Sequence, residues 1–174
     1  MRELTRLPSV TLSATFGSNV DLAALSGRTV LYLYPRTGRP GTESPAGWEV
    51  IPGARGCTPE ACSFRDHFAE LRAAGVTRVF GVSSQDSEYQ SEAVEALRLP
   101  FAMLSDPGLL LAESLDLPTF EVDGQTFYSR LTIIANGSTI EKVIFPVSDP
   151  QSHAAEIVSW LRSASPPATP VPHR

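Results

Sequence analysis

Apolar and β-branched residues gather in runs that predict the strands of a central sheet. Residues 28–34 form a continuous run with TVLYLY at its centre, which is typical of a strand buried on both faces. Residues 77–83 contain RVFGVS and predict a second buried strand. Shorter, partly alternating segments at 10–16 and 20–22 flank a Gly-Ser-Asn turn and predict an edge hairpin.

The second half of the chain carries shorter strand signals. Residues 101–104 predict a short strand that ends before an Asp-Pro-Gly turn. Residues 126–135, with the letters FYSRLTIIA, and residues 139–145 predict a strand pair that turns at an Asn-Gly dipeptide. This pair is expected to extend the sheet.

Helical spacing of apolar residues predicts four helices. In the first, Thr58 is a suitable N-cap, Pro59 fits the first helical position where no N–H is needed, and Gly75 stops the helix. The four helices are expected at 58–74, 87–97, 109–115 and 152–162.

This order of elements predicts an α/β fold. Two βαβ-like stretches, a hairpin and a closing helix give a central mixed sheet with helices on both faces and an N-terminal β-hairpin. The length favours one domain, which we place at residues 1–163. Residues 36–55 are rich in Gly, Pro, Thr and Ser and predict a long loop, and residues 164–174 are a proline-rich segment expected to be a disordered tail.

Charge and composition exclude some classes of function. A formal net charge of −5 argues against a protein that binds nucleic-acid phosphates along a basic stripe. The opening letters MRELTRLPSVTL hold no long apolar run, so we expect no secretory signal, no membrane span and a cytoplasmic location.

Two cysteines, Cys57 and Cys62, are the strongest candidates for chemistry. Both fall at the start of the predicted helix, where unpaired N–H groups and the helix dipole favour a reactive thiolate. Two alternatives remain open from position alone. The cysteines could be ordinary buried thiols, or could belong to a zinc site with His67, although zinc needs four ligands and only three are at hand. We expect no metal and no organic cofactor.

The segment GCTPEACSFRD resembles the active-site segment of the peroxiredoxins, in particular the bacterioferritin-comigratory or Q-type subgroup, whose pattern is close to Gly-Cys-Thr-x-Glu-Ala-Cys. The blocks LYLYPR, VFGVSSQD, LPFAMLSDP and Arg130-Leu131-Thr132 follow the family's order. The resemblance implies a thioredoxin fold. It also implies that Cys57 is the peroxidatic cysteine, that Cys62 is the resolving cysteine, and that Arg130 stabilises the thiolate and the peroxide.

The chain departs from the family before Cys57. Members of the family carry a short Pro-x-x-x-Thr-x-x-Cys segment, whereas here Val50 and Ala54 stand at the places of the proline and the threonine. An insertion therefore separates Pro35 from Cys57. The resemblance leaves open which hydroxyl replaces the family threonine, and Thr37, close to the end of the strand, is the candidate we name.

The function implied by the resemblance is a thiol-dependent peroxidase. Hydrogen peroxide and organic hydroperoxides would be the substrates, a thioredoxin-like dithiol protein the reductant, and a monomer or weak homodimer the working form. The alternatives are a thiol redox sensor and a protein disulfide oxidoreductase on the same fold.

Overall fold

The computed structural model describes residues 5–36 and 57–164, with the side chain of residue 57 left out of that description. The predicted loop 36–55 lies almost entirely outside these residues, as do Thr37 and nearly all of the predicted tail. Within the described part, no helix is long and apolar enough to cross a membrane.

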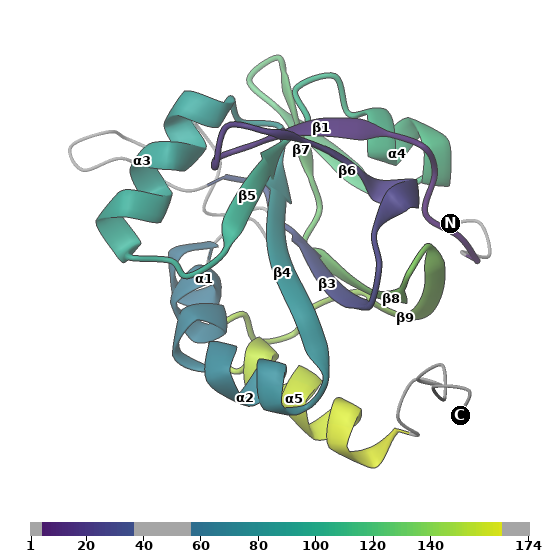
Figure 1. Cartoon of the computed structure of the whole chain (residues 1–174). Coiled ribbons are helices and arrows are strands. Elements are labelled where there is room, and N and C mark those ends of the chain that lie inside the picture. The colour runs from purple at the N-terminus through teal and green to yellow at the C-terminus, as the bar shows by residue number, and fades with distance from the viewer. Residues whose placement is uncertain (1–4, 37–56, 165–174) are drawn as a thin grey trace.

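Within the described residues, a seven-stranded mixed sheet forms the centre of the molecule (Figure 1), in the order β2-β1-β5-β4-β3-β8-β9. Strand β3 pairs in parallel with β4, which pairs in parallel with β5, while β8 is antiparallel to β3 and β9 is antiparallel to β8. The strands are β1 (Thr11–Ala14), β2 (Asn19–Asp21), β3 (Arg28–Leu33), β4 (Val76–Ser83), β5 (Ala102–Ser105), β8 (Leu131–Asn136) and β9 (Thr139–Ile144).

Helices cover both faces of this sheet. Side chains of β3 alternate between the two faces, with Leu31 and Leu33 in one core cluster and Val30 and Tyr32 in the other. Helix α4 and the β1–β2 hairpin pack in the first cluster, and α1, α2, α3 and α5 pack in the second. The helices are the 3₁₀ turn η1 (Leu22–Ala24), α1 (Cys57–Asp66), α2 (Phe68–Ala73), α3 (Ser87–Leu97), α4 (Leu110–Leu115) and α5 (His153–Ser163). The predicted α/β class is confirmed.

The first predicted helix, 58–74, is wrong in two respects. It begins one residue earlier, so Cys57 is its first helical residue and Thr58 is not the N-cap. Pro59 nevertheless stays in the first turn, where its missing N–H breaks no intrahelical bond. The helix is also interrupted at His67, whose ring nitrogen Nδ1 lies 2.9 Å from the Ser63 carbonyl oxygen that already accepts its backbone N–H. The apolar spacing continues across this break and therefore does not reveal it.

The predicted strand 126–135 is two strands that belong to different sheets. β7 (Gln125–Tyr128) pairs with β6 (Thr119–Val122) in a separate hairpin, and β8 pairs with β3 in the central sheet. Arg130 lies in the bend between β7 and β8 rather than inside a strand. The expected pairing of 126–135 with 139–145 is retained only by β8 and β9.

Candidate active site

The amino end of α1 and the start of β8 meet at the carboxyl end of β3. Leu33, the last residue of β3, is the register partner of Leu131, which directly follows Arg130. Arg130 Nη1 donates a hydrogen bond to Glu60 Oε1 at 2.7 Å, and Glu60 lies in the first turn of α1. The pair therefore ties the guanidinium to the turn that Cys57 begins.

Both partners of this ion pair are removed from water. The Arg130 side chain is 2% exposed and the Glu60 side chain is fully buried. Glu60 Oε2 has no hydrogen-bond partner among the described residues. Burial outweighs the attraction of Arg130 and raises the pKa of Glu60 to about 7. Near neutral pH this carboxyl group is thus divided between a neutral form and an anion, and only the anion cancels the charge of Arg130.

A buried histidine stands on the other side of the same region. His153, the first residue of α5, has Nε2 2.7 Å from Thr132 Oγ1, and its ring meets Phe64 of α1 edge-on at 5.8 Å between centroids. Burial, and then the charge of Arg130, lower the pKa of His153 to about 4. The ring is therefore neutral at physiological pH and adds no second cation beside Arg130.

The four predicted site residues are placed to different extents. Cys57 is located by its backbone alone, at the first position of α1. Cys62 is half-buried on the same helix as a free thiol, and Arg130 is bonded to that helix through Glu60. Thr37 lies outside the described residues. No cluster of side chains suited to hold a metal ion occurs among the residues that the structure describes.

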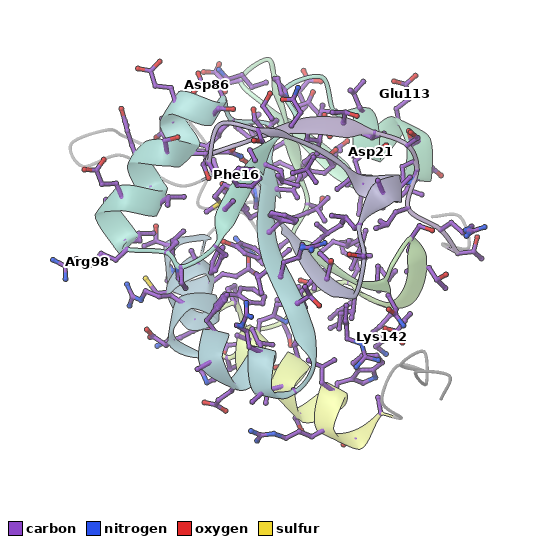
Figure 2. The ribbon with its side chains drawn as sticks, viewed as in Figure 1. Phe16, Asp21, Asp86, Arg98, Glu113 and Lys142 are labelled. Atoms are coloured by element: carbon purple, nitrogen blue, oxygen red, sulfur yellow. The ribbon has the colours of Figure 1, made fainter. Side chains whose placement is uncertain are left out.

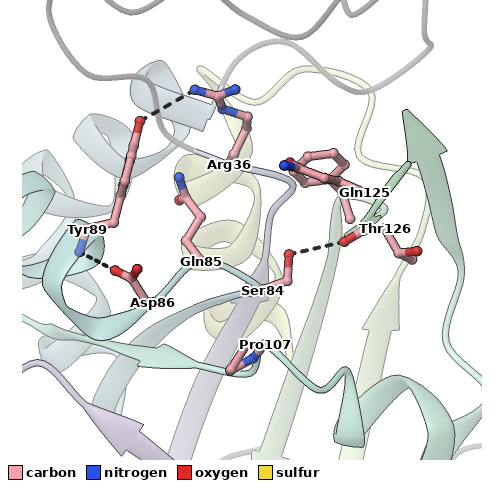
Figure 3. A pocket seen from close by; sticks show the side chains of 9 residues that line it. Arg36, Ser84, Gln85, Asp86, Tyr89, Pro107, Gln125 and Thr126 are labelled. Atoms are coloured by element: carbon pink, nitrogen blue, oxygen red, sulfur yellow. Dashed lines mark hydrogen bonds between the residues drawn. The ribbon is translucent and has the colours of Figure 1, made fainter. Parts of the chain in front are cut away.

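A polar pocket of about 490 Å³ opens at the same edge of the sheet. It is lined by residues that follow β3 and β4, by the start of α3, and by β7 (Figure 3). Within it Arg36 donates to the Tyr89 hydroxyl at 3.4 Å, and the Ser84 hydroxyl donates to the Thr126 carbonyl oxygen at 3.2 Å. The chain thus offers a water-accessible hollow beside the end of β3.

The sequence does not reveal that Glu60 is a buried partner of Arg130. The residue was visible as the glutamate of the Gly-Cys-Thr-x-Glu-Ala-Cys pattern, but a glutamate in a first helical turn is ordinarily read as a solvent-exposed partner of the helix dipole. Its complete burial could not be read from helical spacing. His153 was missed for a similar reason, since it stands at the start of an amphipathic helix without a motif around it.

Comparison with known proteins agrees with this architecture. A family model described as Redoxin matches residues 3–158. The chain is 27% identical to a chloroplastic peroxiredoxin Q of Gentiana triflora, over 90% of this chain and 65% of that protein. It is 29% identical to a putative peroxiredoxin bcp of Coxiella burnetii, over 90% of this chain and 95% of that one. The chain therefore spans just under two thirds of the plant protein and nearly all of the bacterial one.

Solved structures show the same fold. Peroxidoxin BcpB of Mycobacterium tuberculosis superposes with a TM-score of 0.70 at 22% identity, covering 94% of this chain and 99% of that one. Peroxiredoxin Q of Xanthomonas campestris gives a TM-score of 0.70 at 21% identity, covering 90% and 94%. With the family model matching most of its length, the chain belongs to the redoxin family, and its relatives are peroxiredoxins of the Q and bacterioferritin-comigratory type.

Proposed function

We propose that the chain is a thiol peroxidase that reduces hydrogen peroxide and organic hydroperoxides. The observation that supports this most is the Arg130–Glu60 pair, because it brings a permanent cation to the first turn of the helix that Cys57 begins. A cation and a helix amino end both favour a thiolate over a thiol. A related protein from Xanthomonas campestris has been described for alkyl peroxide reduction, which agrees with this substrate class.

In the proposed cycle the Cys57 thiolate attacks the terminal oxygen of the hydroperoxide. The S–O bond forms as the O–O bond breaks, and the leaving oxygen takes a proton to depart as water or an alcohol. Arg130 stabilises the negative charge that moves from sulfur to the leaving oxygen. Cys57 is left as a sulfenic acid, and the Cys62 thiolate displaces its hydroxide as water to form a disulfide. A thioredoxin-like dithiol protein then reduces that disulfide and is itself oxidised.

The cellular location, the extent of the domain and the oligomeric form complete the proposal. Because the reductant is a dithiol protein, a reducing compartment such as the cytoplasm fits the activity. We propose that residues 1–163 form one peroxidase domain, that 36–55 is an insertion relative to the family, and that residues 164–174 take no part in the chemistry. A monomer or weak homodimer is the expected form, and sedimentation equilibrium of the reduced protein tests it.

The rate of reaction with peroxide tests the activity itself. Stopped-flow mixing of the reduced protein with hydrogen peroxide should give a second-order rate constant at least about a thousand times that of free cysteine, which is roughly 4 kcal/mol of barrier lowering. A rate close to that of free cysteine would favour the redox-sensor or disulfide-oxidoreductase alternative instead. Catalysed thiol–disulfide exchange with a dithiol protein in the absence of peroxide would identify a protein disulfide oxidoreductase.

Replacing Arg130 with alanine should raise the pKa of Cys57 and slow peroxide reduction. An opposite charge close to an ionisable group shifts its pKa by about 1 to 3 units, so losing the cation should cost a shift of that order. Thiolate absorbance at 240 nm followed against pH measures it. Since R130A leaves Glu60 buried without its cation, the double variant E60Q/R130A is the control for misfolding, and E60Q alone keeps the cation. A titration of R130A that overlays the wild type would contradict the role of Arg130.

Disulfide formation should unwind the first turns of α1. Cys57 and Cys62 share one continuous helix. Five helical residues separate Cα atoms by roughly 8 to 9 Å. A disulfide needs about 4.4 to 6.8 Å. Oxidised protein should therefore lose circular dichroism at 222 nm and become more open to proteolysis near Phe64, whereas C62S at the same peroxide dose should show neither change. Identical spectra and digestion patterns for the oxidised and reduced wild type would contradict a disulfide within α1.

A further inference from the structure

An apolar groove of about 430 Å³ lies at the opposite end of β4 from the candidate active site. The polar pocket adjoins the residues that follow β4, whereas this groove is bordered by the first half of that strand. Helix α2, the start of β5 and the tip of the β1–β2 hairpin form its other walls. Figure 2 labels Phe16 at this hairpin tip, close to β5. The volume falls in the range of sites that bind small organic molecules.

Aromatic side chains make up much of the groove. Phe80 and Phe101 are 6% and 7% exposed, so they form a largely covered floor. Phe68 is half-buried, and Phe16 remains 59% exposed. A single exposed aromatic residue is ordinary on a protein surface, but here it borders a hollow that three other phenylalanines also line. A ligand in the groove would cover the exposed ring of Phe16, and the removal of this apolar surface from water would favour binding.

Two arginines border the same groove. Arg72 Nη1 donates a hydrogen bond to the Thr77 carbonyl oxygen at 3.4 Å. Thr77 directly precedes Arg78 in the chain. The guanidinium carbon of Arg72 lies 5.8 Å from the centroid of the Phe68 ring. Arg78 Nη1 donates to the Ser26 carbonyl oxygen at 3.1 Å. The cations are therefore held against apolar walls by bonds to neutral oxygens.

Neither cation has a carboxylate partner within the described part of the chain, which distinguishes Arg72 and Arg78 from Arg28 and Arg130. A guanidinium offers five N–H donors in a planar fork that matches a carboxylate. Among the described residues each of these two donates one hydrogen bond, to a neutral carbonyl oxygen. Two such cations on a chain of net charge −5 are a local reversal of sign. The groove is thus apolar in its body and positive at its rim.

We propose that this groove binds a small anionic amphiphile, a carboxylate with an aliphatic or aromatic body. The body lies against Phe16, Phe80 and Phe101, and the carboxylate accepts hydrogen bonds from Arg72 and Arg78. A neutral ligand of the same shape lacks the second contact, and a cationic ligand meets repulsion at the rim. The site is separate from Cys57 and does not depend on the proposed peroxidase activity.

Decanoate is the probe for this proposal, titrated below its micellar concentration into the full-length reduced protein and followed by calorimetry. Saturable binding at one site is expected, with decanol and decyltrimethylammonium binding at least about tenfold more weakly, the effect of about 1.4 kcal/mol. Equal affinities for decanoate and decanol would overturn the role of the arginines. Absence of saturable decanoate binding would overturn the proposal as a whole. It would do so even if an acidic protein, and not a small ligand, covers this face.

Matched variants locate the site. R72Q and R78Q each remove one rim cation, F16S removes the exposed ring, and R162Q removes an arginine of α5 that does not border the groove. The first three should each weaken decanoate binding about fivefold or more, R162Q should leave it unchanged, and all four should keep the peroxide rate of the wild type. A loss of binding in R162Q equal to that in R72Q would show that decanoate responds only to net charge and would contradict the proposal.

Discussion

Replacing Cys57 with serine is expected to reduce peroxide consumption by at least about a thousandfold, to the background of free thiols. A serine hydroxyl stays protonated at neutral pH and is a poor nucleophile without a base, so the amino end of α1 and the charge of Arg130 have no anion to stabilise. Peroxide loss under a thioredoxin-coupled assay measures the effect. Circular dichroism of C57S should match the reduced wild type, since the change is one atom at the first residue of a helix.

The matched control is the other cysteine. C62S should retain the first, fast oxidation of Cys57 and then stop, because no thiol of the chain remains to condense with the sulfenic acid. Mass spectrometry after excess peroxide should show Cys57 carried on to the sulfinic acid. If C57S kept most of its turnover while C62S lost the first oxidation, the peroxidatic and resolving roles would have to be exchanged.

Elements that carry their own local signals could be predicted from the sequence. Helix α3 occupies the expected residues 87–97, with Asp86 accepting a hydrogen bond from the Tyr89 backbone N–H as N-cap. The run at 28–34 is β3, which is buried along its whole length. In both places propensity, capping and burial favour the same structure, so a local pattern is sufficient.

Features that depend on contacts between distant segments could not be predicted. The β6–β7 hairpin was missed because its alternation continues into β8, and only the pairing partners separate the two sheets. The burial of Glu60 depends on Arg130, which is 70 residues away in sequence. The resemblance to a known family identifies Cys57, Cys62 and Arg130 as site residues. The motif does not show which of its polar residues are buried.

The buried pair of titratable groups beside Arg130 should give opposite pH dependences of stability. Glu60 has its pKa raised from 4.5 to about 7, so the folded state holds its proton more tightly than the unfolded state. Its contribution to the free energy of unfolding is present below pH 4.5 and is lost as pH rises through 7. His153 has its pKa lowered from 6.5 to about 4. Its contribution is present above pH 6.5 and is lost as pH falls through 4.

The two effects nearly cancel between pH 4.5 and 6.5. In that window Glu60 is protonated only in the folded state, and His153 is protonated only in the unfolded state. One group therefore lowers the free energy of unfolding by about 1.4 kcal/mol per pH unit while the other raises it by the same amount. Each single contribution amounts to about 3 kcal/mol over its full range.

Single substitutions should reveal the two pH dependences of the free energy of unfolding that cancel each other in the wild type. In E60Q the free energy of unfolding, relative to wild type at the same pH, should rise by about 3 kcal/mol from pH 4.5 to pH 8, because the variant lacks the Glu60 contribution that the wild type loses as pH rises through 7. In H153Q the difference should have the opposite sign, rising by a similar amount as pH falls from 6.5 to 4. Urea unfolding at closely spaced pH values measures both, and the double variant should show the sum of the two difference curves.

The changes expected for E60Q and H153Q come from the burial of these two groups and not from the overall charge of the protein. An exposed carboxylate near His153 therefore provides a control. E156Q alters an exposed carboxylate whose Oε2 lies 3.8 Å from His153 Nδ1, so it changes the charge near the ring without touching the buried pair. Its difference curve should stay within about 0.5 kcal/mol of flat. A flat curve for E60Q as well would mean that the pKa of Glu60 is the same in the folded and unfolded states, so that its carboxyl group is ionised in the folded protein above pH 4.5. In that case its carboxylate would cancel the charge of Arg130 at every pH above 4.5, and the guanidinium could stabilise the Cys57 thiolate there only by hydrogen bonding.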